Sequence, residues 1–98
     1  MNHLPSIHPG EVLREEFLHE LAIGPERLAH DLRLPLVPVT KLLSGQTRLT
    51  ADTALRLSRY FGNSPKFWLG LQNDYDLEKE QRAHQAELDS IRQITTVA

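Results

Sequence analysis

The sequence predicts a small all-α domain of five helices. Apolar residues recur every three or four positions over most of the chain, as on one face of an α-helix, and no segment alternates strictly as a half-buried strand does. Proline, serine and threonine stand where helices would begin, and glycine where they would end. With 98 residues, we expect one domain rather than two.

The first helix is expected to begin at His8-Pro9-Gly10-Glu11. Proline suits the first helical position because its missing N–H would be unsatisfied there anyway, and an early glutamate suits the positive end of the helix. Its apolar face is Val12, Leu13, Phe17, Leu18 and Leu21. The run Ile23-Gly24-Pro25 is expected to end it.

Two short helices are expected next, over residues 25–32 and 37–43, with a tight break at Arg33-Leu34-Pro35 between them. Gly45 reads as the left-handed residue that stops the second. Two short helices joined by such a turn form a helix-turn-helix candidate. Patterning alone equally allows a helical bundle with a tight corner.

Two further helices complete the prediction. Thr50 can cap a fourth helix, which Gly62 ends. Ser64-Pro65 opens a fifth, which is expected to extend through a polar stretch towards Leu88 or Ile91. We therefore expect an arm over residues 1–7, the helix-turn-helix domain over residues 8–80, and a helix end with a loose tail over residues 81–98.

The formal charge of −2 is unevenly distributed along the chain. Residues 1–24 carry a net −3, residues 25–66 a net +4, and residues 67–98 a net −3. A protein that binds duplex DNA needs a local basic surface rather than a positive total. The charge therefore does not exclude a nucleic-acid partner, although ordinary surface variation can also give an excess of this size.

Several classes of function lack sequence support. Without cysteine there is no disulfide, thiolate zinc site or cysteine nucleophile, which weakly favours a reducing, cytoplasmic setting. No apolar run approaches the roughly 20 residues of a membrane helix, so no membrane partner is expected. The histidines show no close pair at helical ligand spacing, and neighbouring carboxylates do not share a helix face. We predict no enzyme activity, no catalytic residue, no cofactor and no metal site. The histidines in question are His3, His8, His19, His30 and His84.

Three runs of the sequence resemble the HigA/VapI-type addiction-module antitoxins. They are HPGEVLREEFL at residues 8–18, LTADTALRLSRYFG at residues 49–62 and SPKFWLGLQNDYDL at residues 64–77. Their order and spacing match over about residues 7–80. The family belongs to the Xre-type, lambda-repressor-like helix-turn-helix proteins. The resemblance implies a homodimeric bacterial repressor that binds the palindromic operator of its own operon and neutralises a co-encoded toxin, usually an mRNA endonuclease.

By that resemblance, residues 37–43 form the recognition helix, whose N-terminal end enters the major groove. Thr40 offers a hydroxyl and a methyl group to base edges, and Lys41 can reach a guanine or a phosphate. Arg48 is expected to grip a phosphate in a bidentate way. The full expected set of DNA-facing residues is Arg27, Val37, Pro38, Thr40, Lys41, Gln46, Thr47 and Arg48.

Three positions depart from the family pattern. Val37 and Pro38 replace polar residues of the recognition helix and donate no side-chain hydrogen bond, and Glu26 replaces a glutamine that would touch the DNA backbone. Specificity then comes from thymine-methyl contacts and DNA shape, or DNA binding is reduced. A stand-alone Xre regulator without a toxin partner is the remaining alternative.

An apolar stripe on the fifth helix has two interpretations, core packing or a dimer contact. Its members are Phe67, Trp68, Leu71 and Tyr75. The surface that would engage a toxin is left open between the arm, the first helix and the C-terminal tail. An acidic flank would suit a basic, RNA-cleaving toxin.

Overall fold

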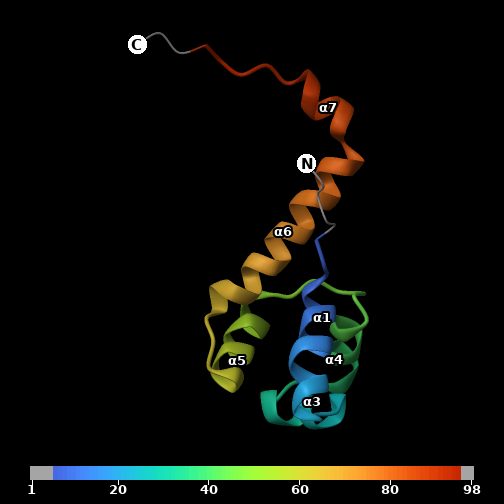
Figure 1. The fold of residues 1–98 in the computed structure, drawn as a ribbon, viewed down its shortest axis with the longest axis vertical. Coiled ribbons are helices and arrows are strands. Elements are labelled where there is room, and N and C mark those ends of the chain that lie inside the picture. The colour runs from blue at the N-terminus through green and yellow to red at the C-terminus, as the bar shows by residue number, and fades with distance from the viewer. Residues whose placement is uncertain (1–5, 96–98) are drawn as a thin grey trace.

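A computed structural model describes residues 6–95, and every regular element within them is helical (Figure 1). The first helix comprises α1 (Pro9–Val12), the π-helical turn η1 (Leu13–Leu18) and α2 (His19–Leu21). The π turn shows in the bond from the His19 N–H to the Arg14 carbonyl, five residues back. The helix ends at Ala22, which adopts the left-handed conformation with φ 54°.

The predicted helix-turn-helix pair is present as α3 (Pro25–Leu32) and α4 (Leu36–Leu43). Arg33 turns the chain between them with φ 60°. The helix α4 begins one residue before the predicted start, because Pro35 is extended and serves as its N-cap. The αα corner is therefore built by a left-handed residue and a proline.

The remaining helices are α5 (Ala51–Phe61), α6 (Pro65–Ala83) and α7 (Gln85–Ser90). The predicted caps are present: Thr50 Oγ1 accepts from the Thr53 N–H at 3.3 Å, and Ser64 Oγ accepts from the Lys66 N–H at 3.0 Å. Gly62 ends α5 in the left-handed conformation. Local capping signals thus placed the start of each of these two long helices.

One apolar core joins the first helix, α3, α4, α5 and the start of α6. Phe17 packs against Phe61 and Trp68, with ring centroids 4.9 Å apart in both pairs. Trp68 is fully buried, and its indole N–H donates to Asn63 Oδ1 at 2.8 Å. The buried apolar residues are Leu13, Leu18, Leu28, Ala29, Leu32, Val39, Leu42, Leu43, Leu49, Ala54, Leu57 and Trp68.

The helix α6 leaves the globular part and carries the chain outward (Figure 1), which gives the molecule dimensions of 55 × 28 × 25 Å. Helical structure extends to Ser90, as expected, but with one interruption, because the helix breaks at His84 with φ −125° and ψ 25°. The ring of His84 bridges the two pieces, 3.2 Å from Glu80 and 3.5 Å from Glu87. No residue of α7 is buried, so no packing opposes the break.

The first described residue lies against the outer part of α6. The Ser6 N–H donates to both carboxylate oxygens of Glu78 at 3.0 Å, so residue 6 is held against α6. Residues 1–5 of the expected arm and residues 96–98 of the expected loose tail lie outside the described residues. Within residues 6–95, no helix is long and apolar enough to cross a membrane.

Candidate nucleic-acid interface

The helix α4 presents one face to the core and the other to solvent. Val39, Leu42 and Leu43 are buried, which fixes the rotation of the helix about its axis. Val37 is 61% exposed. The other expected DNA-facing residues of this helix, Pro38, Thr40 and Lys41, are exposed as well. The outward face is apolar at its N-terminal end and carries one charge.

The Thr40 side chain is partly committed within α4. Its hydroxyl donates to the Val37 carbonyl at 2.8 Å. The hydroxyl proton is therefore engaged, while the oxygen lone pairs and the methyl group remain available to a base edge. A thymine methyl group is the contact that this arrangement favours.

The first helix holds the C-terminal end of α4 in place. Gly10 is buried against the Leu42 carbonyl, so closely that a Cβ atom at this position would lie 1.8 Å from the carbonyl oxygen. The Arg14 guanidinium donates to the Leu43 carbonyl at 2.8 Å, which satisfies one of the acceptors left free at a helix end. These two contacts fix α4 along its axis and limit its distance from the first helix.

His8 fastens the loop that follows α4. Its Nδ1 accepts from the Gly10 N–H at 2.9 Å, so the hydrogen on Nε2 donates to the Thr47 carbonyl at 3.0 Å. This pair of bonds requires the neutral ring. Burial lowers the pKa of His8, and this outweighs the opposing influence of the Thr47 carbonyl and the Asp76 and Glu11 carboxylates. The ring also packs edge-on to Tyr75, at 5.0 Å.

The loop residues Gln46, Thr47 and Arg48 are exposed, as a phosphate contact requires. The Arg48 side chain, however, forms an ion pair with Asp76 of α6. Gln72 joins the same cluster, donating to Asp76 at 2.9 Å and accepting from the Leu49 N–H at 2.7 Å. The free protein thus holds Arg48 against α6.

On α3, Arg27 is exposed and lies 3.5 Å from Asp31. Asp31 also accepts from the Tyr60 hydroxyl of α5 at 2.6 Å. The hydrogen bond from Tyr60 is the main cause that lowers the pKa of Asp31, and the hydrogen bond from His30 adds to it. The bond to Asp31 also raises the pKa of Tyr60. Glu26 is exposed at the second position of the helix.

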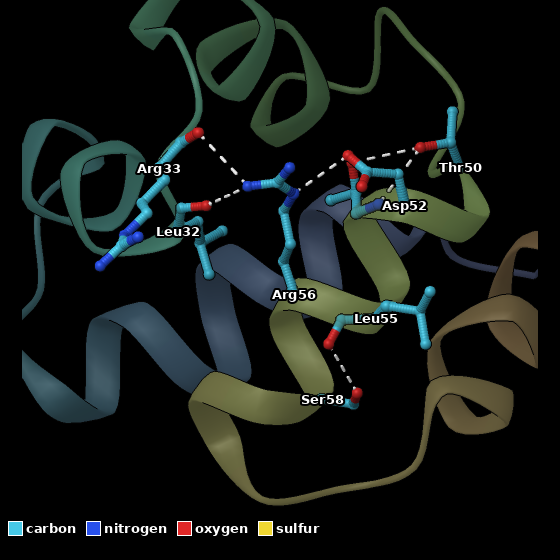
Figure 2. A network of polar contacts seen from close by, with 8 residues as sticks. Leu32, Arg33, Thr50, Asp52, Leu55, Arg56 and Ser58 are labelled. Atoms are coloured by element: carbon cyan, nitrogen blue, oxygen red, sulfur yellow. Dashed lines mark hydrogen bonds and ion pairs between the residues drawn. The ribbon is translucent and has the colours of Figure 1, made fainter.

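A second arginine supports the turn between α3 and α4. Arg56 of α5 donates to the Leu32 carbonyl at 2.8 Å and to the Arg33 carbonyl at 3.3 Å, and its Nε donates to Asp52 at 3.0 Å. Figure 2 shows the guanidinium between these acceptors, with the Arg33 side chain pointing away from them. Although Arg56 contributes to the positive charge of residues 25–66, its guanidinium is used to hold the turn between α3 and α4.

The apolar stripe on α6 divides between two environments. Trp68 belongs to the core, whereas Phe67 is 42% exposed. Leu71 and Tyr75 are half-buried. In the part of the chain that the structure describes, no group of three or more His, Cys, Asp or Glu side chains is placed to hold a metal ion.

Two relatives place the chain in a family. Virulence-associated protein I of Dichelobacter nodosus is 41% identical over 85 residues, which cover 87% of this chain and 79% of that protein. Antitoxin HigA-1 of Vibrio cholerae serotype O1 is 34% identical over 83 residues, covering 85% of this chain and 78% of that protein. The chain belongs to the HigA/VapI family of helix-turn-helix antitoxins. No family model matches the sequence.

Solved HigA-family structures share the fold. Antitoxin HigA of Pseudomonas aeruginosa, solved with the higBA promoter, superimposes with a TM-score of 0.87 at 38% identity, over 92% of this chain and 99% of that one. Antitoxin GraA in complex with its operator gives 0.88 at 36% identity, over 98% of each chain. The predicted family and all-α helix-turn-helix class are confirmed, and the role in this family is non-enzymatic.

Sequence reasoning missed the residues that position α4 in this HigA-family chain. The sequence predicts only a helix start at His8 and Gly10, and it indicates no role for Arg14. The one available signal was the glycine, which is unfavourable inside a helix unless close packing requires it. Nothing in the sequence next to Arg48 or Asp76 indicates that the two side chains pair.

Proposed function

We propose that the chain is a homodimeric, operator-binding antitoxin of the cytoplasm. It represses its own operon by presenting α4 to the major groove of a palindromic operator, and it neutralises a co-encoded mRNA-endonuclease toxin. The observation that carries this proposal is an exposed α4 in a fold with TM-scores of 0.87 and 0.88 to chains solved with promoter or operator DNA. The rigid support of α4 by Gly10 and Arg14 suits a helix that must enter a groove in one orientation.

The proposed contacts divide by chemistry. Val37, Pro38 and Thr40 offer apolar surface to thymine methyl groups, and Lys41 reaches a guanine edge or a phosphate. Arg27, Gln46, Thr47 and Arg48 contact phosphates. Because Arg48 is paired with Asp76 in the free protein, it exchanges a carboxylate for a phosphate when DNA binds.

A palindromic operator requires two copies related by a two-fold axis. Phe67 is the member of the α6 stripe that has the most surface to offer a second copy, because Trp68 is in the core. The variant Phe67→Ala is expected to raise the monomer fraction in light scattering coupled to size exclusion. An unchanged dimer would place the contact elsewhere.

Fluorescence anisotropy on the chain's own promoter tests DNA binding. The affinity is expected to fall steeply with salt, since phosphate contacts release counterions. Lys41→Ala and Arg48→Ala should each weaken binding, and the loss of a phosphate contact should reduce the salt slope by about 1. Arg82→Ala, on the outer part of α6, is the matched control and should leave binding unchanged. Flat, salt-insensitive titrations would contradict the DNA-binding role.

A second candidate, an antitoxin with reduced DNA binding, is favoured by Val37, Pro38 and Glu26, which remove donors or add a negative charge at the interface. In that case Lys41→Ala and Arg48→Ala leave any promoter interaction unchanged. A toxin-sized reading frame beside the gene separates both candidates from a stand-alone regulator.

A further inference from the structure

An open groove of about 770 Å³ runs between the first helix and the pair formed by α3 and α4. Its apolar surface comes from Leu18 and Ile23 of the first helix and the segment after it, and from Pro25 and Leu43 opposite. Glu15 and His19 line the same groove. An apolar groove of this size, rimmed by polar side chains, is typical of a surface that receives part of a partner.

The helix that lines one side of this groove is acidic. Its exposed surface carries Glu11, Glu15, Glu16 and Glu20, of which Glu15 lines the groove itself. Its one basic residue, Arg14, directs its guanidinium to the Leu43 carbonyl, with Glu15 4.0 Å away. Next to Gly24, which also lines the groove, the Glu26 carboxylate lies 3.4 Å from the position that a Cβ atom on Gly24 would occupy. The groove is therefore lined on one side by a helix of net negative charge.

Several carboxylates of the chain are paired internally. On α6, Asp76 pairs with Arg48 and Glu78 with Arg82, and on the first helix Glu15 lies 4.0 Å from Arg14. Among residues 6–95, no basic side chain lies within ion-pair distance of Glu16 or Glu20. These two acids of the first helix thus have their charge available to an external partner.

We propose that this groove is where the toxin docks, through an apolar side chain flanked by lysine or arginine residues. The proposal rests on the antitoxin function proposed above. A protein that cleaves RNA carries positive charge to bind phosphates, which complements the acidic helix that lines the groove. DNA is a poor occupant because the glutamates repel phosphates, although Thr40 lies at the groove edge. A second copy in an isologous contact would bring like charges together.

The test uses the full chain and the purified product of the gene adjacent to its own, with affinity measured by titration calorimetry. His19→Trp fills the groove without adding charge, and Glu16→Arg with Glu20→Arg reverses the unpaired acids. The matched control, Glu80→Arg with Glu87→Arg, makes the same charge change on the C-terminal flank. All five substituted side chains are exposed, and circular dichroism verifies folding.

We expect each groove variant to weaken toxin binding at least tenfold and the control to change it less than twofold. Equal weakening by the groove charge variant and the control would show a long-range effect of net charge and overturn the docking site. Unchanged binding in both groove variants would overturn it as well, while the antitoxin function stands. If the wild-type chain binds no product of the adjacent gene, the antitoxin function itself fails, and the docking site with it.

Discussion

Gly10→Ala is the smallest change expected to disrupt the support of α4. The added Cβ atom would lie 1.8 Å from the Leu42 carbonyl oxygen and 2.8 Å from its carbonyl carbon. Real Cβ contacts do not fall below 3.0 Å, so the first helix and α4 must separate locally by roughly 1.2 Å. Both obstructing atoms are backbone, so no side-chain rotation can relieve the contact.

The cost has two parts. Overpacking of a well-packed contact costs about 1–3 kcal/mol, and a rigid backbone obstacle places Gly10→Ala at the upper end. The same separation stretches the Arg14 bond to Leu43 and the His8 bond to Thr47, which together contribute roughly another 1 kcal/mol. We expect a loss of about 3–4 kcal/mol, or a fall in Tm of roughly 12–30 °C for a domain of this size.

Urea unfolding followed by circular dichroism measures this loss, and Gly70→Ala is its control. Gly70 lies within α6, and a Cβ atom there would have no heavy atom within 4 Å. The same substitution should therefore stabilise the protein by about 0.5–1 kcal/mol through helix propensity. If Gly10→Ala unfolds within about 0.5 kcal/mol of the wild type, the close contact between the first helix and α4 is refuted.

Three further predictions concern Arg56, His8 and Asp76. Arg56→Ala should lower the free energy of unfolding by about 1–3 kcal/mol in urea titrations, because the carbonyls at the end of α3 lose a charged donor. The lowered pKa of His8 means that the unfolded chain takes up a proton first, so stability should be complete above pH 6.5 and fall as the pH drops below it. A His8→Gln variant, measured at the same pH values, should lose that part of the dependence. Asp76→Asn should tighten operator binding severalfold at low salt, since Arg48 no longer gives up a carboxylate partner; weaker binding would instead mean that Asp76 orients Arg48 for the phosphate.

Local signals in the sequence predicted most helix boundaries. Pro9, Pro25 and Pro65 each stand at the first position of a helix, where geometry and the missing N–H favour proline whatever surrounds it. The break at His84 is different, because the residue is neither glycine nor proline. A helix with no buried face is held by local interactions alone, and the apolar pattern that predicts helices gives no information there.

The candidate site was less predictable, because its support depends on contacts between distant parts of the chain. His8 meets Thr47 across 39 positions, and Arg14 meets Leu43 across 29. Arg48 was predicted to grip a phosphate from the family resemblance and the bidentate geometry of its guanidinium. Its actual partner lies 28 residues away on another helix, where nothing in the adjacent sequence indicates it.

The structure separates the residues that hold α4 from those that would read DNA. The contacts described above that hold α4 use its buried face or its C-terminal carbonyls. Its outward side chains are therefore not needed to hold the helix in place. Pro38 illustrates this: it lies in the first turn of α4, where a missing N–H and a fixed φ cost the helix nothing. The fold therefore did not require Val37 or Pro38 at these positions. Under the operator-binding proposal, these two residues form a helix end that reads thymine methyl groups and groove shape in place of hydrogen-bond donors.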